Sequence, residues 1–249
     1  MAGHSKWKQI KRKKAVTDSR RAQAWTKLIR EITVAAKAGG GDPGGNPRLR
    51  KAVDDAKAAN MPNDNIDRAI KKGTGELGGA AYEEITYEGY GPGGAAILVE
   101  ASTDNANRTV AEVRHAFSRN GGNLGTSNSV AWMFDRKGEI ALPVAGVAED
   151  RAMEDALDAG ATDFATDADN YVVTTEPNTF HAVMDALKAR GYQLESADIV
   201  MSPRNLVQVA ASDGHRLLKL IEVLEDLEDV SKVFTNLDID ALELEEAGT

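Results

Sequence analysis

Apolar residues recur every three or four positions in the first part of the chain, which predicts helices that each pack one face. The first stripe lies within residues 18–38 and consists of Ala22, Trp25, Leu28, Ile29, Ile32 and Ala36. Gly39-Gly40-Gly41 ends this helix. Asn46-Pro47 predicts the next helix start, with an N-cap followed by proline in the first turn. A third, short helix carries Ile66 and Ile70 and ends at Gly73. The three helices predict a small bundle.

The pattern then changes to one of strands and helices. Residues 82–88 alternate like a strand and residues 95–101 form an apolar run, with a glycine-rich turn between them. Asp104 is the expected cap of a helix that ends at Gly121-Gly122. A further short strand is expected at residues 129–134.

Residues 138–202 follow their own order of elements. The expected elements are a strand at 139–142, a helix at 149–159, strands at 162–165 and 171–175, a helix at 178–190 and a strand at 193–201. This β-α-β-β-α-β order is that of the ferredoxin-like split unit. After Pro203 we expect a strand at 206–210, a helix with Leu217, Leu220 and Leu224 inside, and a last strand at 230–234.

These elements predict an α+β protein of three domains. An N-terminal three-helix domain is expected at residues 1–75. Two α/β domains follow, and the second is a ferredoxin-like domain inserted into the first. The expected boundaries are 76–136 with 204–249 for the middle domain and 137–203 for the inserted domain.

Two glycine-rich segments resemble phosphate-binding loops but have the wrong context. Gly73–Gly78 matches the spacing G-x-G-x-x-G, yet a helix precedes it, so we interpret it as a linker between domains. Gly89–Gly94 joins two strands and has no Lys-Ser or Lys-Thr pair, so we interpret it as a hairpin turn.

Charge is divided unevenly along the chain, although the net charge is only −9. Residues 1–75 hold 18 Lys and Arg against 7 Asp and Glu, a balance of +11. Because the whole chain has 30 bases and 39 acids, the remaining residues carry −20. The first region therefore attracts a polyphosphate, whereas most of the remainder repels one.

The bases of the first region predict a nucleic-acid-binding surface. Ammonium and guanidinium groups at this density neutralise phosphates, and an aromatic ring among them can stack on a base. The expected contact residues are Lys6, Trp7, Lys8, Lys11, Arg12, Lys13, Lys14, Arg20, Arg21, Lys27 and Arg30. Two structural alternatives stay open at this point: a charge run that only confers solubility, and a Trp7 that anchors on the following helices.

The composition gives no sign of catalysis. Cysteine is absent, and His4, His115, His181 and His215 have no metal-ligand spacing. Carboxylates from distant positions could still meet in space, but no motif indicates that they do. We expect a non-enzymatic protein with no cofactor, no metal site and no small-molecule substrate. No apolar run reaches membrane-spanning length and no secretory signal begins the chain, so we expect a cytoplasmic protein without a membrane partner.

Several motifs together closely resemble the YebC/PmpR family, whose members are described as probable transcriptional regulators. They include Gly3-His4-Ser5-Lys6-Trp7, Asn46-Pro47-Arg48-Leu49-Arg50, Tyr87-Glu88-Gly89-Tyr90-Gly91-Pro92, Thr103-Asp104-Asn105 with Asn107-Arg108-Thr109, and Gly121-Gly122-Asn123-Leu124-Gly125. The family pattern usually has glycine at the position of Asn128, which puts a local turn in doubt. The resemblance implies three domains, with the third inserted, and no catalytic residue.

Three functions follow from these observations. The resemblance and the basic region indicate a DNA-binding regulator of transcription. The same resemblance extends to mitochondrial proteins that look like translational activators, and it implies a connection with the ribosome and with relief of stalled elongation. A translation factor that binds ribosomal RNA is therefore the alternative. The third is a scaffold whose acidic body, residues 76–249, binds a basic protein. The sequence leaves DNA and ribosomal RNA open as targets.

Overall fold

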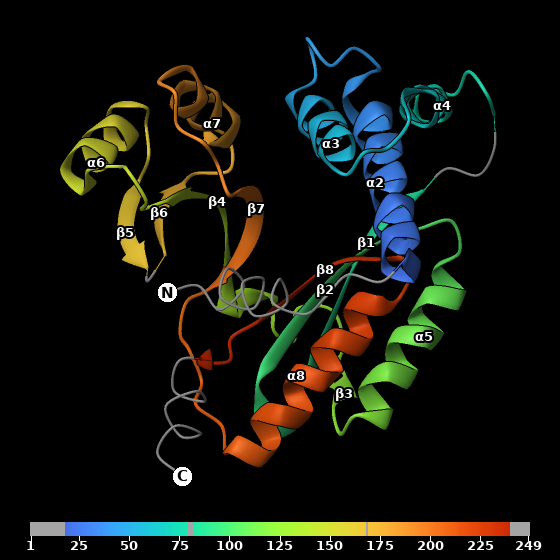
Figure 1. The fold of residues 1–249 in the computed structure, drawn as a ribbon. Coiled ribbons are helices and arrows are strands. Elements are labelled where there is room, and N and C mark those ends of the chain that lie inside the picture. The colour runs from blue at the N-terminus through green and yellow to red at the C-terminus, as the bar shows by residue number, and fades with distance from the viewer. Residues whose placement is uncertain (1–17, 79–81, 168, 240–249) are drawn as a thin grey trace. The chain divides into compact units, whose positions relative to one another are not determined.

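The computed structural model describes residues 18–78, 82–167 and 169–239, and within helix α2 it describes side chains from residue 23 onward (Figure 1). The described residues form two compact units. One consists of Met133–Asn205, and the other contains the residues before and after it. Both units contain helices and sheets, which confirms the α+β class.

The first helices form the expected bundle. Helix α2 spans Asp18–Gly39, α3 spans Pro47–Ala58 and α4 spans Asn63–Gly73. Their core contains Ile32, Ala35, Ala36, Leu49, Ala52, Val53, Ala56, Met61, Ile66 and Ala69. Gly73 is required for close packing, because a Cβ at this position would lie 2.4 Å from the carbonyl oxygen of Thr33.

Asn46 confirms the predicted helix start and also joins two segments. Its side-chain oxygen accepts a bond of 3.1 Å from the amide of Leu49, which caps α3. Its Nδ2 group donates to the carbonyl oxygens of Ala35 and Gly40 at 2.8 and 2.9 Å. Asn46 is buried, and its bonds to Leu49 and Ala35 are buried with it. One side chain therefore fixes the end of α2 against the start of α3.

The second part of this unit is a four-stranded antiparallel sheet with the order β3-β1-β2-β8. Strands β1 (Glu83–Tyr90) and β2 (Ala96–Thr103) form the expected hairpin, β3 spans Asn123–Leu124 and β8 spans Val230–Thr235. Helices α5 (Ala106–Arg119) and α8 (Ala211–Asp226) lie side by side (Figure 1). They bury Val113, Phe117, Leu217, Leu220 and Leu224 with Ile97 and Val99 of the sheet.

The unit Met133–Asn205 has the predicted β-α-β-β-α-β order. Its elements are β4 (Phe134–Pro143), α6 (Glu149–Asp158), β5 (Asp163–Asp167), β6 (Asn170–Thr175), α7 (Phe180–Ala189) and β7 (Ser196–Pro203). The strands pair antiparallel in the order β5-β6-β4-β7. The two crossovers place β4 and β6 at the centre, which is the ferredoxin-like arrangement.

Three local predictions are wrong. The strand expected at 129–134 is absent, because the amides of Val130 and Ala131 bond the carboxylate of Glu88 and cannot join a ladder. A short 3₁₀ turn occupies Ala131–Met133 instead, and β4 begins at Phe134. The strand expected at 206–210 is reduced to a single bridge between Val207 and Leu237.

The third error concerns the cap of α5. Asn105 is the N-cap, with its side chain accepting from the amide of Arg108 at 3.1 Å. Asp104 instead pairs with the Arg108 guanidinium at 3.0 Å. Asn128, where the family pattern has glycine, adopts φ 64°, a left-handed conformation that asparagine tolerates.

The Asn46 contacts generate a stability prediction. Asn46→Ala should lower the free energy of unfolding by about 1–3 kcal/mol, because it removes the cap of α3 and both bonds that Asn46 donates to the carbonyl groups of Ala35 and Gly40. Asn46→Ser should be intermediate, since serine can cap α3 but cannot reach both carbonyls. Thermal unfolding of the three proteins would check this order, and equal loss in both variants would assign the whole effect to the carbonyl bonds.

Candidate nucleic-acid interface

The structure describes two of the expected nucleic-acid contacts. Lys6, Trp7, Lys8, Lys11, Arg12, Lys13 and Lys14 lie outside the described residues. Arg20 and Arg21 belong to the described backbone of α2, but their side chains lie outside the description. Lys27 and Arg30 are the two whose surroundings the structure defines.

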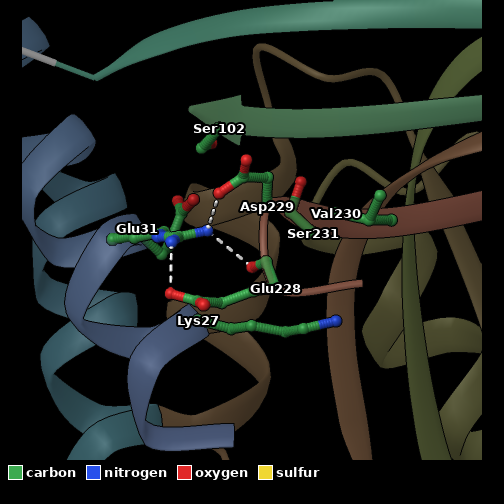
Figure 2. A pocket seen from close by; sticks show the side chains of 8 residues that line it. Lys27, Glu31, Ser102, Glu228, Asp229, Val230 and Ser231 are labelled. Carbon is green, nitrogen blue, oxygen red and sulfur yellow. Dashed lines mark hydrogen bonds and ion pairs between the residues drawn. The ribbon is translucent and has the colours of Figure 1, made fainter. Parts of the chain in front are cut away.

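Arg30 lies in a buried ion-pair cluster, with 7% of the residue exposed. Its guanidinium donates to the carboxylates of Asp229 and Glu228, both at 2.6 Å, and also to the carbonyl oxygen of Glu228 at 2.6 Å. Figure 2 marks these bonds. The ring of Tyr82 lies 5.5 Å from the guanidinium carbon. Arg30 was expected to contact nucleic acid, but its guanidinium is buried and bound to these acceptors of the same chain.

Arg30 is buried because α2 packs on two sides, one in the bundle and one against another segment of the chain. Arg30 points away from the bundle core, as its position on the α2 helical wheel indicates. The start of β8, together with the residues just before it, covers that side of α2 and supplies the acidic partners. A pattern of 3.6 residues per turn identifies the face that does not join the bundle. It contains no information about a segment almost 200 residues later.

Lys27 also contributes to the joint between α2 and the segment formed by the end of α8 and the start of β8. Its ammonium group donates to the carbonyl oxygen of Glu225, near the C-terminal end of α8. Carbonyl groups in the last turn of a helix have no intrahelical donor, so a lysine there is favourable.

A pocket at this joint is lined by Lys27, Arg30, Glu31, Ser102, Glu228, Asp229, Val230 and Ser231 (Figure 2). The ion pairs of Arg30 make this pocket a joint between elements rather than an anion-binding site.

Asp229 is the centre of this joint. One carboxylate oxygen binds Arg30, and the other accepts bonds from Arg108 Nη2 at 2.7 Å, Thr109 Oγ1 at 2.7 Å and Thr103 Oγ1 at 3.1 Å. Its side chain is 2% exposed. Burial alone would raise the pKa of Asp229. The hydrogen bonds from Thr109 and Arg108 and the charge of Arg30 outweigh burial and lower this pKa. We call these five residues the Asp229 cluster.

A second ion-pair group joins the bundle to the sheet. Arg48 of α3 pairs with Glu31 of α2 at 2.8 Å and with Glu84 of β1 at 2.7 Å. Burial lowers the pKa of Arg48, but hydrogen bonds to both glutamates outweigh it and raise this pKa. The group is partly exposed, so its contribution to stability is smaller than that of the Asp229 cluster.

Glu88 is a further carboxylate with a structural role. It accepts amide hydrogens from Asn128, Val130 and Ala131 at 2.7, 2.8 and 2.7 Å. Burial raises the pKa of Glu88, but these amide bonds outweigh burial and lower it. The carboxylate therefore stays charged and fixes the loop that leads to β4.

The described residues contain no arrangement that indicates catalysis. No group of three His, Asp or Glu side chains in residues 18–78, 82–167 and 169–239 is placed to hold a metal ion. Among the same residues, no helix has both the length and the apolar character needed to cross a membrane. The buried carboxylates Asp229 and Glu88 have lowered pKa values, opposite to the shift of a general acid that works near neutral pH.

Exposed bases of the described bundle were not singled out from the sequence. Lys57, Arg68 and Lys71 are exposed on α3 and α4. Lys57 and Lys71 belong to the last turns of their helices, where a cation also interacts favourably with the helix dipole. The signal in the sequence was the Lys71-Lys72-Gly73 helix end, which has this structural explanation as well.

The fold and these contacts define a class: an α+β protein of two compact units whose described polar clusters join its own elements. The chain belongs to the TACO1/YebC family. Residues 5–76 match the family model of the TACO1/YebC protein N-terminal domain, and residues 82–237 match that of the TACO1/YebC second and third domain. The resemblance seen in the sequence motifs is confirmed.

Individual relatives cover almost the whole chain. A "Probable transcriptional regulatory protein" of Gemmatimonas aurantiaca is 58% identical over 96% of this chain and 97% of its own length. One from Geobacter sulfurreducens is 54% identical over 98% and 99% of the two chains. A crystal structure of a conserved hypothetical protein from Aquifex aeolicus is 45% identical, has a TM-score of 0.83, and aligns over 90% of this chain and 93% of that one.

The Asp229 cluster predicts a large effect of a small substitution. Asp229→Asn should lower the free energy of unfolding by about 2–4 kcal/mol, because Arg30 loses its buried countercharge. Asp226→Asn is the matched control, since Asp226 is exposed three residues earlier, and it should change stability by less than about 0.5 kcal/mol. Urea unfolding of both variants gives the comparison. Similar effects of the two substitutions would show that the cluster contributes little.

The lowered pKa values predict acid sensitivity. Because folding lowers the pKa values of Asp229 and Glu88, the unfolded state takes up protons first as the pH falls. Their stabilisation is therefore complete above the unfolded pKa, near 4, and is lost as the pH falls through the folded pKa values. In urea unfolding, the stability difference between wild type and Asp229→Asn should shrink below about pH 4. A constant difference down to about pH 2.5 would contradict the lowered pKa of Asp229.

Proposed function

We propose that the protein is a non-enzymatic regulator of gene expression that binds nucleic acid through its basic N-terminal region and acts on transcription. The observation that carries the proposal is the division of charge, +11 in residues 1–75 against −20 in the remainder. The names of the curated relatives, probable transcriptional regulatory proteins, support transcription as the process.

The bases of this region have two uses in the proposal. Lys27, Arg30 and Arg48 bind carboxylates or carbonyl groups of the same chain, so they hold the bundle on the acidic body. The phosphate contacts then come from the bases that precede them. These are Lys6, Lys8, Lys11, Arg12, Lys13, Lys14, Arg20 and Arg21, with Trp7 available for stacking on a base.

We further propose three domains with the boundaries 1–75, 76–136 with 204–249, and 137–203. The compactness of Met133–Asn205 supports the inserted domain. The two family models, which meet between residues 76 and 82, support the first boundary. In this division the N-terminal domain carries the phosphate contacts, and the two acidic domains position it.

The target is proposed to be duplex DNA, read mainly through its backbone. The described helices of the bundle present a mixture of exposed acids and bases, and the sequence shows no helix-turn-helix signature. Phosphate contacts make the affinity dependent on salt, with a slope of about −0.9 per neutralised phosphate. Strong salt dependence with modest sequence preference is therefore the expected behaviour.

Charge reversal tests this assignment. A variant with Lys11, Arg12, Lys13 and Lys14 changed to Glu should bind DNA at least about 100-fold more weakly at about 0.15 M salt, and its salt slope should fall by about 3–4. The control reverses the exposed bases Arg136, Arg151, Lys188 and Arg204, which changes the net charge equally. Fluorescence polarisation with labelled duplex DNA measures both proteins.

Equal losses of DNA affinity in the two variants would show that only net charge matters, and would overturn the assignment of the phosphate contacts to the N-terminal region.

The same pair of variants distinguishes DNA from ribosomal RNA. Co-sedimentation with ribosomes that is lost in the first variant, in a protein that binds free duplex only feebly, would replace transcription with translation as the process.

A further inference from the structure

Two exposed aromatic side chains meet at one carbonyl group outside the basic region. Among the described residues, Trp132 is the most exposed large apolar side chain, at 62%, and Tyr90 is 36% exposed. The hydroxyl of Tyr90 donates to the carbonyl oxygen of Ser129 at 3.0 Å, and the indole N–H of Trp132 donates to the same oxygen at 3.2 Å. Both rings are therefore anchored at their polar atoms while much of their surface contacts water.

The loop that contains Ser129 is held in place by hydrogen bonds to Glu88. The buried Glu88 carboxylate holds the amides of Asn128, Val130 and Ala131, on both sides of Ser129. The amide of Gly125 donates to the carbonyl oxygen of Glu88 at 2.8 Å. Since Glu88 and Tyr90 lie two residues apart on β1, they share one face of the sheet. The aromatic pair is thus preorganised, which reduces the entropy lost when a ligand stacks on it.

The surroundings differ in charge from the rest of the acidic body. Residues 113–134 contain Arg114 and Arg119 and no Asp or Glu. Arg216 of α8 lies against Gly121, since a Cβ there would be 2.2 Å from its Nη2 atom. Asn123, two residues beyond Gly121, pairs with Tyr90 in the sheet. The guanidinium of Arg216, which is exposed and also pairs with Asp213 of the same helix at 3.3 Å, therefore lies at the same end of the sheet as the aromatic pair.

We propose that Tyr90 and Trp132 form a stacking platform for unpaired bases of a nucleic acid, with Arg119 and Arg216 contacting its phosphates. Stacking on aromatic rings suits single strands, because every base has a π-face and unpaired bases are accessible. Exposed arginines, polar loop residues and the absence of Asp and Glu from residues 113–134 favour this ligand over an apolar protein surface. The proposal rests on the proposed function for the ligand class, and it assigns the platform a preference for single strands.

The basic N-terminal region and the aromatic platform make different contributions to nucleic-acid binding. The basic N-terminal region increases affinity for every nucleic acid through its phosphates, whether the strands are paired or not. The platform increases affinity only where bases are unstacked. The ratio of single-strand to duplex affinity is therefore the quantity that reports the platform, and it is independent of the total affinity.

Substitution of Trp132 in the full chain tests the platform. Probes are labelled 12-nucleotide oligo-uridine, oligo-thymidine and a DNA duplex. Trp132→Ala and Trp132→Leu should weaken binding of a single-stranded probe by about 5- to 100-fold and change duplex binding less than about twofold. Trp132→Phe should retain most of the affinity, because it keeps an aromatic face. Arg119→Glu with Arg216→Glu should weaken the same single-stranded probe and reduce its salt slope.

Trp132 also provides a direct signal. Its fluorescence should be quenched when oligo-uridine or oligo-thymidine binds, so the total quenching should be smaller in Trp132→Phe, in which only the contribution of Trp7 remains. Loss on both strands indicates base stacking in general, whereas loss on uridine alone places the site on RNA; either result supports the platform. The thermal unfolding midpoint of Trp132→Leu confirms that the fold is kept.

The outcome that overturns the platform is an unchanged single-strand to duplex ratio in Trp132→Leu, with quenching that is the same in all proteins. Loss of a copurifying protein from that variant, with oligonucleotide binding intact, would assign Trp132 to a protein contact and also overturn it. Reversal of Lys11–Lys14 lowers all affinities without changing the ratio, so failure of the platform is distinguishable from failure of the proposed function.

Discussion

The buried carboxylate of Asp229 is the interaction on which the arrangement of the larger unit depends. It receives bonds from α2 through Arg30, from the end of β2 through Thr103, and from α5 through Arg108 and Thr109. Asp229 itself immediately precedes β8. Helix α2, the consecutive elements β2 and α5, and the start of β8 thus share one negative charge. A charge buried without such partners would be strongly destabilising, so the bundle, the sheet and α5 are fixed in place together.

This cluster changes how the division of charge is understood. An excess of bases at one end of a chain and of acids in the remainder suggests separate ligands for each. In this protein part of the excess is used internally, since Arg30 and Arg48 of the bundle bind Asp229, Glu228 and Glu84 of the other part. The acidic body is therefore a partner of its own basic region. The proposed function therefore assigns the phosphate contacts to the bases that precede Lys27 along the chain.

The motifs that identify the family have structural explanations where they are described. Thr103, Arg108 and Thr109 bind Asp229, Asn105 caps α5, and Glu88 holds the loop at Asn128–Ala131. Each of these polar groups is satisfied within the chain, as buried polar groups must be. Their presence identifies the fold rather than a ligand. The Glu88 loop connects both aspects, because it is a structural motif that also presents Tyr90 and Trp132.

The sequence by itself determined the features that depend on neighbours along the chain. The bundle helices, the Asn46 cap, the β-α-β-β-α-β order and the uneven charge all follow from local spacing, and the family follows from its motifs. Only the tertiary structure decided the burial of Arg30, the loss of the strands at 129–134 and 206–210, and the meeting of Tyr90 with Trp132. The reason is physical, because these features depend on partners far away in the sequence. Tyr90 and Ser129 are 39 residues apart, and Arg30 and Asp229 are 199 residues apart. Periodicity reports which face of an element is apolar, but it cannot report which distant carboxylate will bind the other face.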